Sequence, residues 1–189
     1  MSEPEAAPVA RGLAPADLRH FLLRRLHSLS GVVPIGAFFF VHMYTNYQAV
    51  GAGGPARFDE HVKNLQENPA IVWAEIFGIG VPILFHALYG LFIAGEARFN
   101  AGRYRFGANW RYVLQRVTGV LLLFFIAYHV WNTRLATVFN PEDFAASHGH
   151  ISFAYMSEYL TATHFGVPTW LIYVVGVVAT TFHLANGRW

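Results

Sequence analysis

Four histidines stand inside stretches of the sequence that are otherwise apolar. They are His42, His86, His129 and His183, one in each of four long runs with almost no charged residues. Ionisable side chains are costly in apolar surroundings and usually mark a functional site there. The neutral imidazole is also the commonest metal ligand among side chains. The four histidines are therefore candidate ligands for a metal or a metal-containing cofactor.

The runs that carry these histidines are long enough to cross a lipid bilayer. The chain is 54% hydrophobic and 13% charged, whereas a soluble domain has about 25% charged residues. We expect an all-α membrane protein, an up-down transmembrane helix bundle formed by residues 17–189, after a flexible N-terminal tail over 1–16. Because a transmembrane helix needs roughly 20 apolar residues, the helices are predicted over approximately 28–50, 69–97, 111–135 and 165–188.

The basic residues predict how the bundle is oriented. Of 13 lysines and arginines, only Arg57, Lys63 and Arg134 lie outside the N-terminal segment, the connection between the second and third helices, and the C-terminal end. By the positive-inside rule, these basic segments and the N-terminus face the cytoplasm. The formal net charge of +2 is explained by this topology, and no nucleic-acid partner is expected.

Counting residues from the cytoplasmic side places the histidines at two depths. At a helical rise of about 1.5 Å per residue, His42 and His129 lie about 22 and 20 Å from that side. His86 and His183 lie about 15 and 8 Å from it. We call the first two the outer pair and the other two the inner pair. Each pair comes from two parallel helices, which lie diagonally across the core of an up-down bundle.

Two imidazoles that face each other across a bundle suit a six-coordinate haem iron. Two such levels predict two stacked b-type haems. Two ligands at one level are too few for a closed zinc site, which takes four. Two alternatives stay open, namely ordinary core histidines bonded to backbone carbonyls, and a haem-free transporter with a histidine-lined path for metal ions or protons.

The surroundings of the histidines repeat along the chain. FHALYG and FHLANG each place a glycine four residues after an inner-pair histidine. RRLHSLSG and LQRVTG end in Gly31 and Gly119, which the outer-pair histidines follow by 11 and 10 residues. Either a porphyrin or a closely packed helix would be admitted by the glycines inside the predicted helices, which are Gly31, Gly36, Gly78, Gly80, Gly119 and Gly176. Pro34 and Pro82 lie inside predicted helices and are expected to kink them.

Longer runs around these motifs resemble the cytochrome b subunit of succinate:quinone oxidoreductase, in the single-subunit dihaem form of bacteria that use menaquinone. The runs are RRLHSLSGVVPIG, FHALYGLFIA, NWRYVLQRVTGVLLLFFIAYHVWNTR and FHLANGRW. The resemblance implies a bacterial cytoplasmic-membrane anchor for a flavoprotein subunit and an iron–sulfur subunit, which exchanges electrons with menaquinone through two haem b groups. It assigns the inner pair to the higher-potential haem and the outer pair to the lower-potential haem.

The resemblance leaves four questions open. The family has five transmembrane helices, whereas four are predicted here. A cytochrome b subunit of another membrane oxidoreductase remains an alternative. The direction of succinate and fumarate chemistry, and a higher oligomer of the complex, also stay open.

Polar residues at the cytoplasmic ends of the first and third helices are candidates for binding haem propionates. The resemblance points to this region, and the candidates are His27, Ser28, Arg25 and Arg116. For the arginines, the alternative role is to anchor the helices at the membrane interface.

Glu75 is the one acid in the second apolar run. Its distance from His86 along the helix places it near the outer pair, where a carboxyl group would exchange protons with a bound quinone. The alternative is a protonated core acid held by a hydrogen bond. Asp59 and Glu60, in the connection between the first and second helices, are rival acids for the same role.

Overall fold

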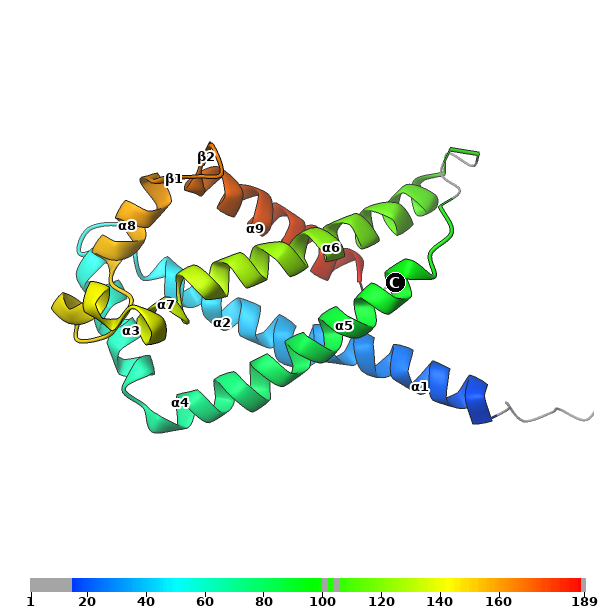
Figure 1. Ribbon diagram of the computed structural model, residues 1–189, viewed down its shortest axis with the longest axis horizontal. Coiled ribbons are helices and arrows are strands. Elements are labelled where there is room, and N and C mark those ends of the chain that lie inside the picture. The colour runs from blue at the N-terminus through cyan, green and yellow to red at the C-terminus, as the bar shows by residue number, and fades with distance from the viewer. Residues whose placement is uncertain (1–14, 100–101, 104–105, 188–189) are drawn as a thin grey trace, which may run out of the picture.

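The computed structural model describes residues 15–99, 102–103 and 106–187, and four long helices in it cross one another as a bundle (Figure 1). The first consists of α1 (Pro15–Ser30), η1 (Gly31–Ile35) and α2 (Gly36–Tyr47), and the second of α4 (Pro69–Trp73), η2 (Ala74–Gly80) and α5 (Val81–Gly95). The third is α6 (Gly107–Asn132) and the fourth is α9 (Thr169–Asn186). Within the described residues, these four are long and apolar enough to cross a membrane. The predicted all-α transmembrane fold is thereby confirmed.

The first helix begins at Pro15, well before the predicted boundary at Ser28. Apolar composition marks where a helix enters lipid, and α1 continues beyond that point as a charged helix. Proline at a first helical position and Asp17 in the first turn are both favourable at a helix N-terminus. The predicted tail over 1–16 falls largely on residues outside the described range.

Two of the helices contain π-helical stretches beside their prolines. Pro34 lies inside η1, and Pro82 follows the end of η2 by two residues. A proline has no backbone N–H, so the α-helical hydrogen bond is lost there and the chain takes up a wider turn. Each stretch adds a residue to its helix, and this extra residue has consequences for the histidine spacing.

The opposite ends of the long helices are covered by shorter elements, which we call the loop end of the molecule. They are α3 (Gly54–Gln66), α7 (Ala136–Phe139), the 3-10 helix η3 (Pro141–Ser147), α8 (Phe153–Thr161) and a small antiparallel hairpin of β1 (Thr163–His164) and β2 (Val167–Pro168). Phe58 and Val62 on α3 are buried, and so is Phe144 on η3. The loop end therefore has a small apolar core of its own.

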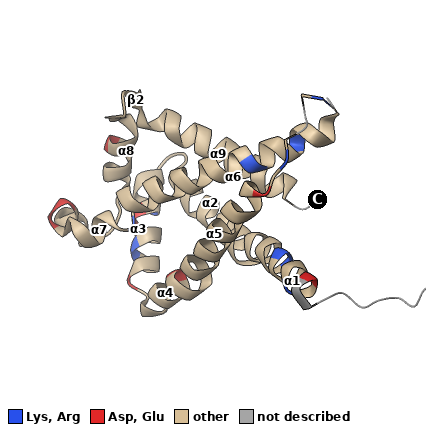
Figure 2. Ribbon diagram, turned by 45° about the vertical axis from the view of Figure 1, so that its right-hand side comes forward, with Lys and Arg blue, Asp and Glu red and all other residues tan. Residues whose placement is uncertain are grey.

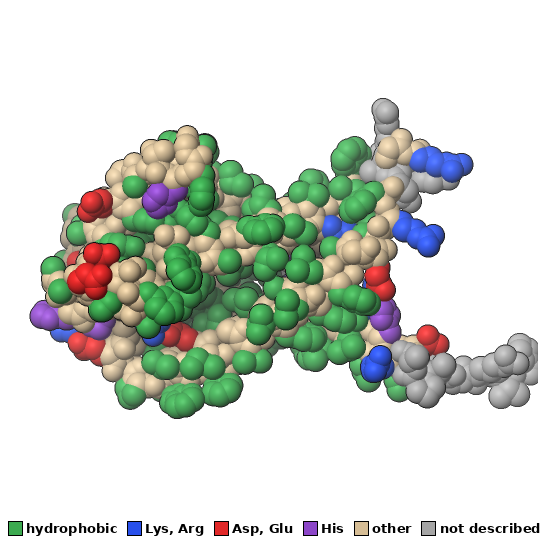
Figure 3. Space-filling view, in the orientation of Figure 1, with side chains coloured by type: hydrophobic (Ala, Val, Ile, Leu, Met, Phe, Trp, Pro, Cys, Tyr) green, Lys and Arg blue, Asp and Glu red, His purple; other side chains and the backbone are tan. Residues whose placement is uncertain are grey.

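Hydrophobic and charged side chains occupy different parts of the molecule, as is typical of a membrane protein. Hydrophobic side chains cover its middle, and charged side chains gather mainly toward its two ends (Figure 3). Lysines and arginines cluster near the start of α1 and the start of α6 (Figure 2). We call this the basic end, and it lies opposite the loop end.

Candidate cofactor site between paired histidines

The four membrane histidines meet in the two pairs that their depths predict. His86 on α5 faces His183 on α9, with ring centroids 6.2 Å apart and ring planes at 81°. His42 on α2 faces His129 on α6, with centroids 5.6 Å apart and planes at 73°. Bonds from imidazole nitrogen to a metal are about 2 Å long. Rings at these separations are therefore suited to sharing one metal atom between them.

Both inner-pair histidines are held through Nδ1 by the neighbouring helix. Nδ1 of His86 lies 3.0 Å from the carbonyl oxygen of His27, and Nδ1 of His183 lies 3.1 Å from that of Gln115. A carbonyl can only accept, so each Nδ1 must carry the proton. The lone pair is then on Nε2, the arrangement in which metal-bound histidines are usually held.

A hydroxyl group adds a second contact at each inner-pair Nδ1. Ser30 Oγ lies 3.5 Å from Nδ1 of His86, and Thr118 Oγ1 lies 3.2 Å from Nδ1 of His183. Both hydroxyls donate to carbonyls of their own helices, which leaves their lone pairs free to accept. The two halves of the chain thus support their inner histidines in the same way.

Glycines make room for these imidazole rings. A Cβ atom on Gly31 would lie 2.5 Å from Cε1 of His86, and one on Gly119 would lie 3.0 Å from Cε1 of His183. One turn beyond the inner histidines, Gly90 and Gly187 in turn receive the side chains of His27 and Gln115. The motif glycines therefore admit side chains of the neighbouring helix. This is what close helix packing requires at these positions.

Replacing Gly31 by alanine is expected to disturb the inner pair. The new Cβ atom would overlap the ring of His86, and overpacking of this kind costs about 1–3 kcal/mol. We expect lower thermal stability and weaker binding of a cofactor between His86 and His183, measured by its absorption spectrum. The matched control is Gly95→Ala, because nothing lies within 4 Å of a Cβ atom there. Equal spectra and melting temperatures for the two variants would contradict the close contact.

The π-helical stretch η1 explains why the repeat is unequal. The outer-pair histidines follow Gly31 and Gly119 by 11 and 10 residues. Only the first of these intervals contains a π-helical stretch, η1, whereas α6 is α-helical throughout. The added residue of η1 is absorbed in the wide turn, so both outer histidines still point toward the core.

A cavity of about 1040 Å³ lies among the four long helices beside the inner pair. His86 and His183 line it, together with apolar side chains from all four helices. Its size is at the upper end of the range for ligand pockets, about 300–1,000 Å³. The described residues contain no cluster of three or more histidines, aspartates or glutamates that could hold a metal ion. The apolar lining and the two histidines would suit a flat, largely apolar group, which His86 and His183 would hold.

Three of the four candidates for haem propionates reach this cavity. His27, Ser28 and Arg116 line it, whereas Arg25 does not and instead lies over the ring of Phe21 at 5.2 Å. Nε2 of His27 and Nε of Arg116 are buried without a hydrogen-bond partner, and a buried polar atom without a partner is unfavourable. Anionic groups of a ligand would accept a hydrogen bond from Arg116, and also from His27 in the tautomer that carries its proton on Nε2.

The arginine that lines the cavity in place of Arg25 is its sequence neighbour Arg24. It forms an ion pair of 2.8 Å with Glu96 and a hydrogen bond to His20. The sequence signal for it was weak, because two consecutive arginines on a helix point in different directions and the pattern does not choose between them.

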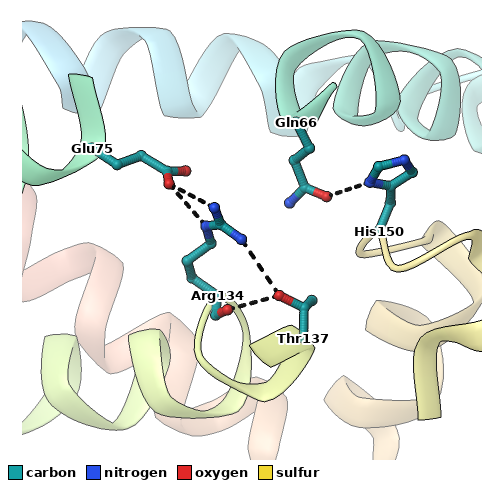
Figure 4. Close-up of polar contacts among 5 residues, drawn as sticks. All are labelled: Gln66, Glu75, Arg134, Thr137 and His150. Atoms are coloured by element: carbon teal, nitrogen blue, oxygen red, sulfur yellow. Dashed lines mark hydrogen bonds and ion pairs between the residues drawn. The ribbon is translucent and has the colours of Figure 1, made fainter. Parts of the chain in front are cut away.

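Glu75 lies inside η2 and forms an ion pair with Arg134, which follows α6 (Figure 4). Oε2 of Glu75 is 2.9 Å from both Nη2 and Nε of Arg134. Arg134 also contacts Thr137 of α7. The carboxyl group thus has a cationic partner that the sequence does not predict, because the two residues are far apart in the chain. Glu75 stands 11 residues before His86, which would be about three turns of a regular α-helix. Since η2 widens this part of the helix, the separation does not correspond to three such turns.

The loop end adds a second set of polar contacts near this ion pair. His150 Nδ1 lies 3.0 Å from Oε1 of Gln66 on α3 (Figure 4). Asp59 on α3 accepts a hydrogen bond from the backbone N–H of Phe153. Asp59, one of the rivals of Glu75, therefore holds the start of α8.

The comparisons with known proteins identify the family of the chain. Residues 97–188 match the family described as succinate dehydrogenase/fumarate reductase transmembrane subunit. The chain is 40% identical over 172 residues to the succinate dehydrogenase cytochrome b558 subunit of Bacillus subtilis (strain 168). The matched region covers 90% of this chain and 78% of that protein. The chain belongs to this family of membrane cytochrome b subunits. No solved structure matches it significantly.

Membership defines the broad role of the molecule. It is the membrane-anchoring cytochrome b subunit of a succinate dehydrogenase or fumarate reductase complex, and its partners are a flavoprotein subunit and an iron–sulfur subunit. A cytochrome b subunit binds haem b, and the inner pair and its cavity fit that group. Sequence reasoning missed Gln115 and Thr118, although their position just before a motif glycine repeats that of His27 and Ser30.

Proposed function

We propose that this subunit passes electrons between the iron–sulfur subunit and menaquinone through two haem b groups, each bound by two histidines. The inner site carries the proposal, because His86 and His183 face each other beside the cavity with only Nε2 left for a metal. His42 and His129 face each other at a similar separation and support a second haem at the outer level.

The chain's own groups bind and orient the haems. Bound haem supplies one-electron transfer at its iron. His86 and His183 hold the inner haem, and His42 and His129 the outer one. His27, Ser28 and Arg116 line the cavity where they would bind propionate groups, with Arg25 a weaker candidate because it points elsewhere. The apolar walls exclude water from the electron path.

The charge distribution supports an orientation in the bacterial cytoplasmic membrane. The basic end would face the cytoplasm, with the N-terminus on that side, in keeping with the positive-inside rule. The inner pair would then lie nearer the iron–sulfur subunit, and the arginines of the basic end would form the docking surface. The outer pair would bring electrons toward the other side of the membrane.

The decisive experiment is to purify the complex from membranes and reduce it with dithionite. We expect a b-type absorption band, two haems per chain, and copurification with a flavoprotein and an iron–sulfur protein. A preparation without haem would exclude the proposal and favour a histidine-lined transporter. Haem without these two partner proteins would point to another membrane oxidoreductase.

Glu75 is proposed to exchange protons with menaquinone at the loop end. Arg134 holds its carboxyl group there, and a positioned acid–base group contributes about 100- to 10,000-fold to a proton-coupled reaction. For Glu75→Gln we therefore expect quinone reduction by the complex to fall about 100-fold or more. The absorption spectrum of both haems should stay unchanged, since glutamine has nearly the same shape.

Glu60→Gln is the matched control for this prediction. Glu60 lies on α3 at the same end of the molecule and was a rival for the same role. Full activity in Glu75→Gln together with a loss in Glu60→Gln would transfer the proton-exchange role to Glu60. An altered haem spectrum in Glu75→Gln would instead assign Glu75 a structural role in the bundle.

A further inference from the structure

The outer-pair histidine His129 is held in a different way from the inner pair. Its Nδ1 lies 3.0 Å from the hydroxyl oxygen of Tyr173 on α9, rather than beside a backbone carbonyl. The ring of Phe125 stacks on it at 6.0 Å with an angle of 19°. The ring of Tyr173 meets it edge-on at 5.6 Å and 76°. One polar and two aromatic contacts therefore fix the orientation of this imidazole.

Helix α9 is shaped to provide this support. Gly176 lies one turn after Tyr173, and a Cβ atom there would overlap the ring of Phe125. The missing side chain lets Phe125 lie against α9, where it also packs edge-on against Tyr173 at 5.5 Å. Gly176 thus allows Phe125, and through it His129, to take up the observed position.

The other face of Tyr173 is packed by the loop end. Tyr159 of α8 meets its ring at 6.1 Å, and Tyr159 itself is buried at 8% exposure. Burial raises the pKa of Tyr159, so its phenol stays protonated and uncharged. Tyr173 is therefore held between His129 and the ring of Tyr159, with little freedom to move its hydroxyl group.

Helices α6 and α9 consequently support each other's histidines. Gln115 and Thr118 of α6 hold His183 of α9, while Tyr173 of α9 holds His129 of α6. The inner support combines the backbone carbonyl of Gln115 with the hydroxyl of Thr118, so no single side-chain substitution removes all of it. The outer support is a single phenol oxygen, and one substitution removes it completely.

We propose that Tyr173 is a positioning residue for the outer haem. The inference rests on the proposed function, because it takes His129 as a ligand of that haem. With Nε2 of His129 as the metal-binding atom, Nδ1 carries the proton and would donate its hydrogen bond to the phenol oxygen of Tyr173. Such an acceptor raises the basicity of a metal-bound imidazole, which stabilises the oxidised iron and keeps the reduction potential of the outer haem low.

The test compares Tyr173→Phe with Tyr128→Phe in the complete complex. Both changes remove one phenol oxygen from the same aromatic cluster, but the hydroxyl of Tyr128 contacts Nδ1 of His164, which is not a ligand. The reduction potentials of both haems are measured by redox titration followed by absorption, and the ligand field by electron paramagnetic resonance of the oxidised complex.

Tyr173→Phe is expected to shift the outer-haem potential upward and change its resonance signal, while the inner haem is unaffected. Loss of the outer haem alone would support the same role. Tyr128→Phe should leave both haems as they are. An unchanged outer haem in Tyr173→Phe, an equal shift in both variants, or loss of both haems would overturn the inference. A wild-type complex with fewer than two haems would instead refute the proposed function.

Discussion

Replacing His183 by alanine is expected to remove one haem signal and leave the other. His183 is the inner-pair residue of α9, and its imidazole is the only part of the side chain that can bind iron. Without it, His86 alone cannot complete a six-coordinate site. The outer pair belongs to other segments of the bundle and stays in place. The measurements are the haem content of the purified complex and the reduced-minus-oxidised spectrum.

The pairing adds a stricter requirement to this prediction. His86→Ala should remove the same spectral component as His183→Ala, since both residues face each other at 6.2 Å. His61→Ala is the control, because His61 lies on α3 at the loop end, outside both pairs. If His86→Ala and His183→Ala removed different components, the assignment of the inner pair would be wrong. If the His61 variant also lost a haem, the loss would reflect general destabilisation.

The sequence carried enough information to predict the four helices and the two levels of histidines. Both follow from local quantities, namely charge-free length and residue count along a helix. The partners of the histidines were not predictable in this way. That Tyr173 would meet His129, or Arg134 meet Glu75, depends on how α-helices rotate about their axes when they pack, and small changes in rotation select different side chains.

The repeats were a partial guide to those partners. Ser30 and Thr118 each stand immediately before a motif glycine, so either one could have pointed to the other. Arg25 shows the opposite case. The pattern RR does not reveal which arginine faces the core, and in the structure it is Arg24 that lines the cavity.

The unequal spacing of the outer pair leads to the second large prediction. Pro34 lies within η1, the π-helical stretch that gives the first helix one residue more than α6 between glycine and histidine. Deleting Pro34 removes both the extra residue and the missing N–H, so the stretch can become a regular α-helix with the ten-residue spacing of α6. We expect this deletion to retain both haems, even though a residue is lost inside a transmembrane helix.

Deleting one residue from α6 is expected, by contrast, to remove the outer haem. This helix has no π-helical stretch to absorb a change, so removing Leu121 rotates everything beyond it by about 100° relative to the preceding segment. His129 then turns away from His42, and the outer haem is lost while the inner one stays. Absorption spectra of the two deletion variants, measured side by side, decide the matter. Loss of the outer haem in the Pro34 deletion would mean that the extra residue of the first helix sets the direction of His42, and that the two halves of the chain do not share a common register.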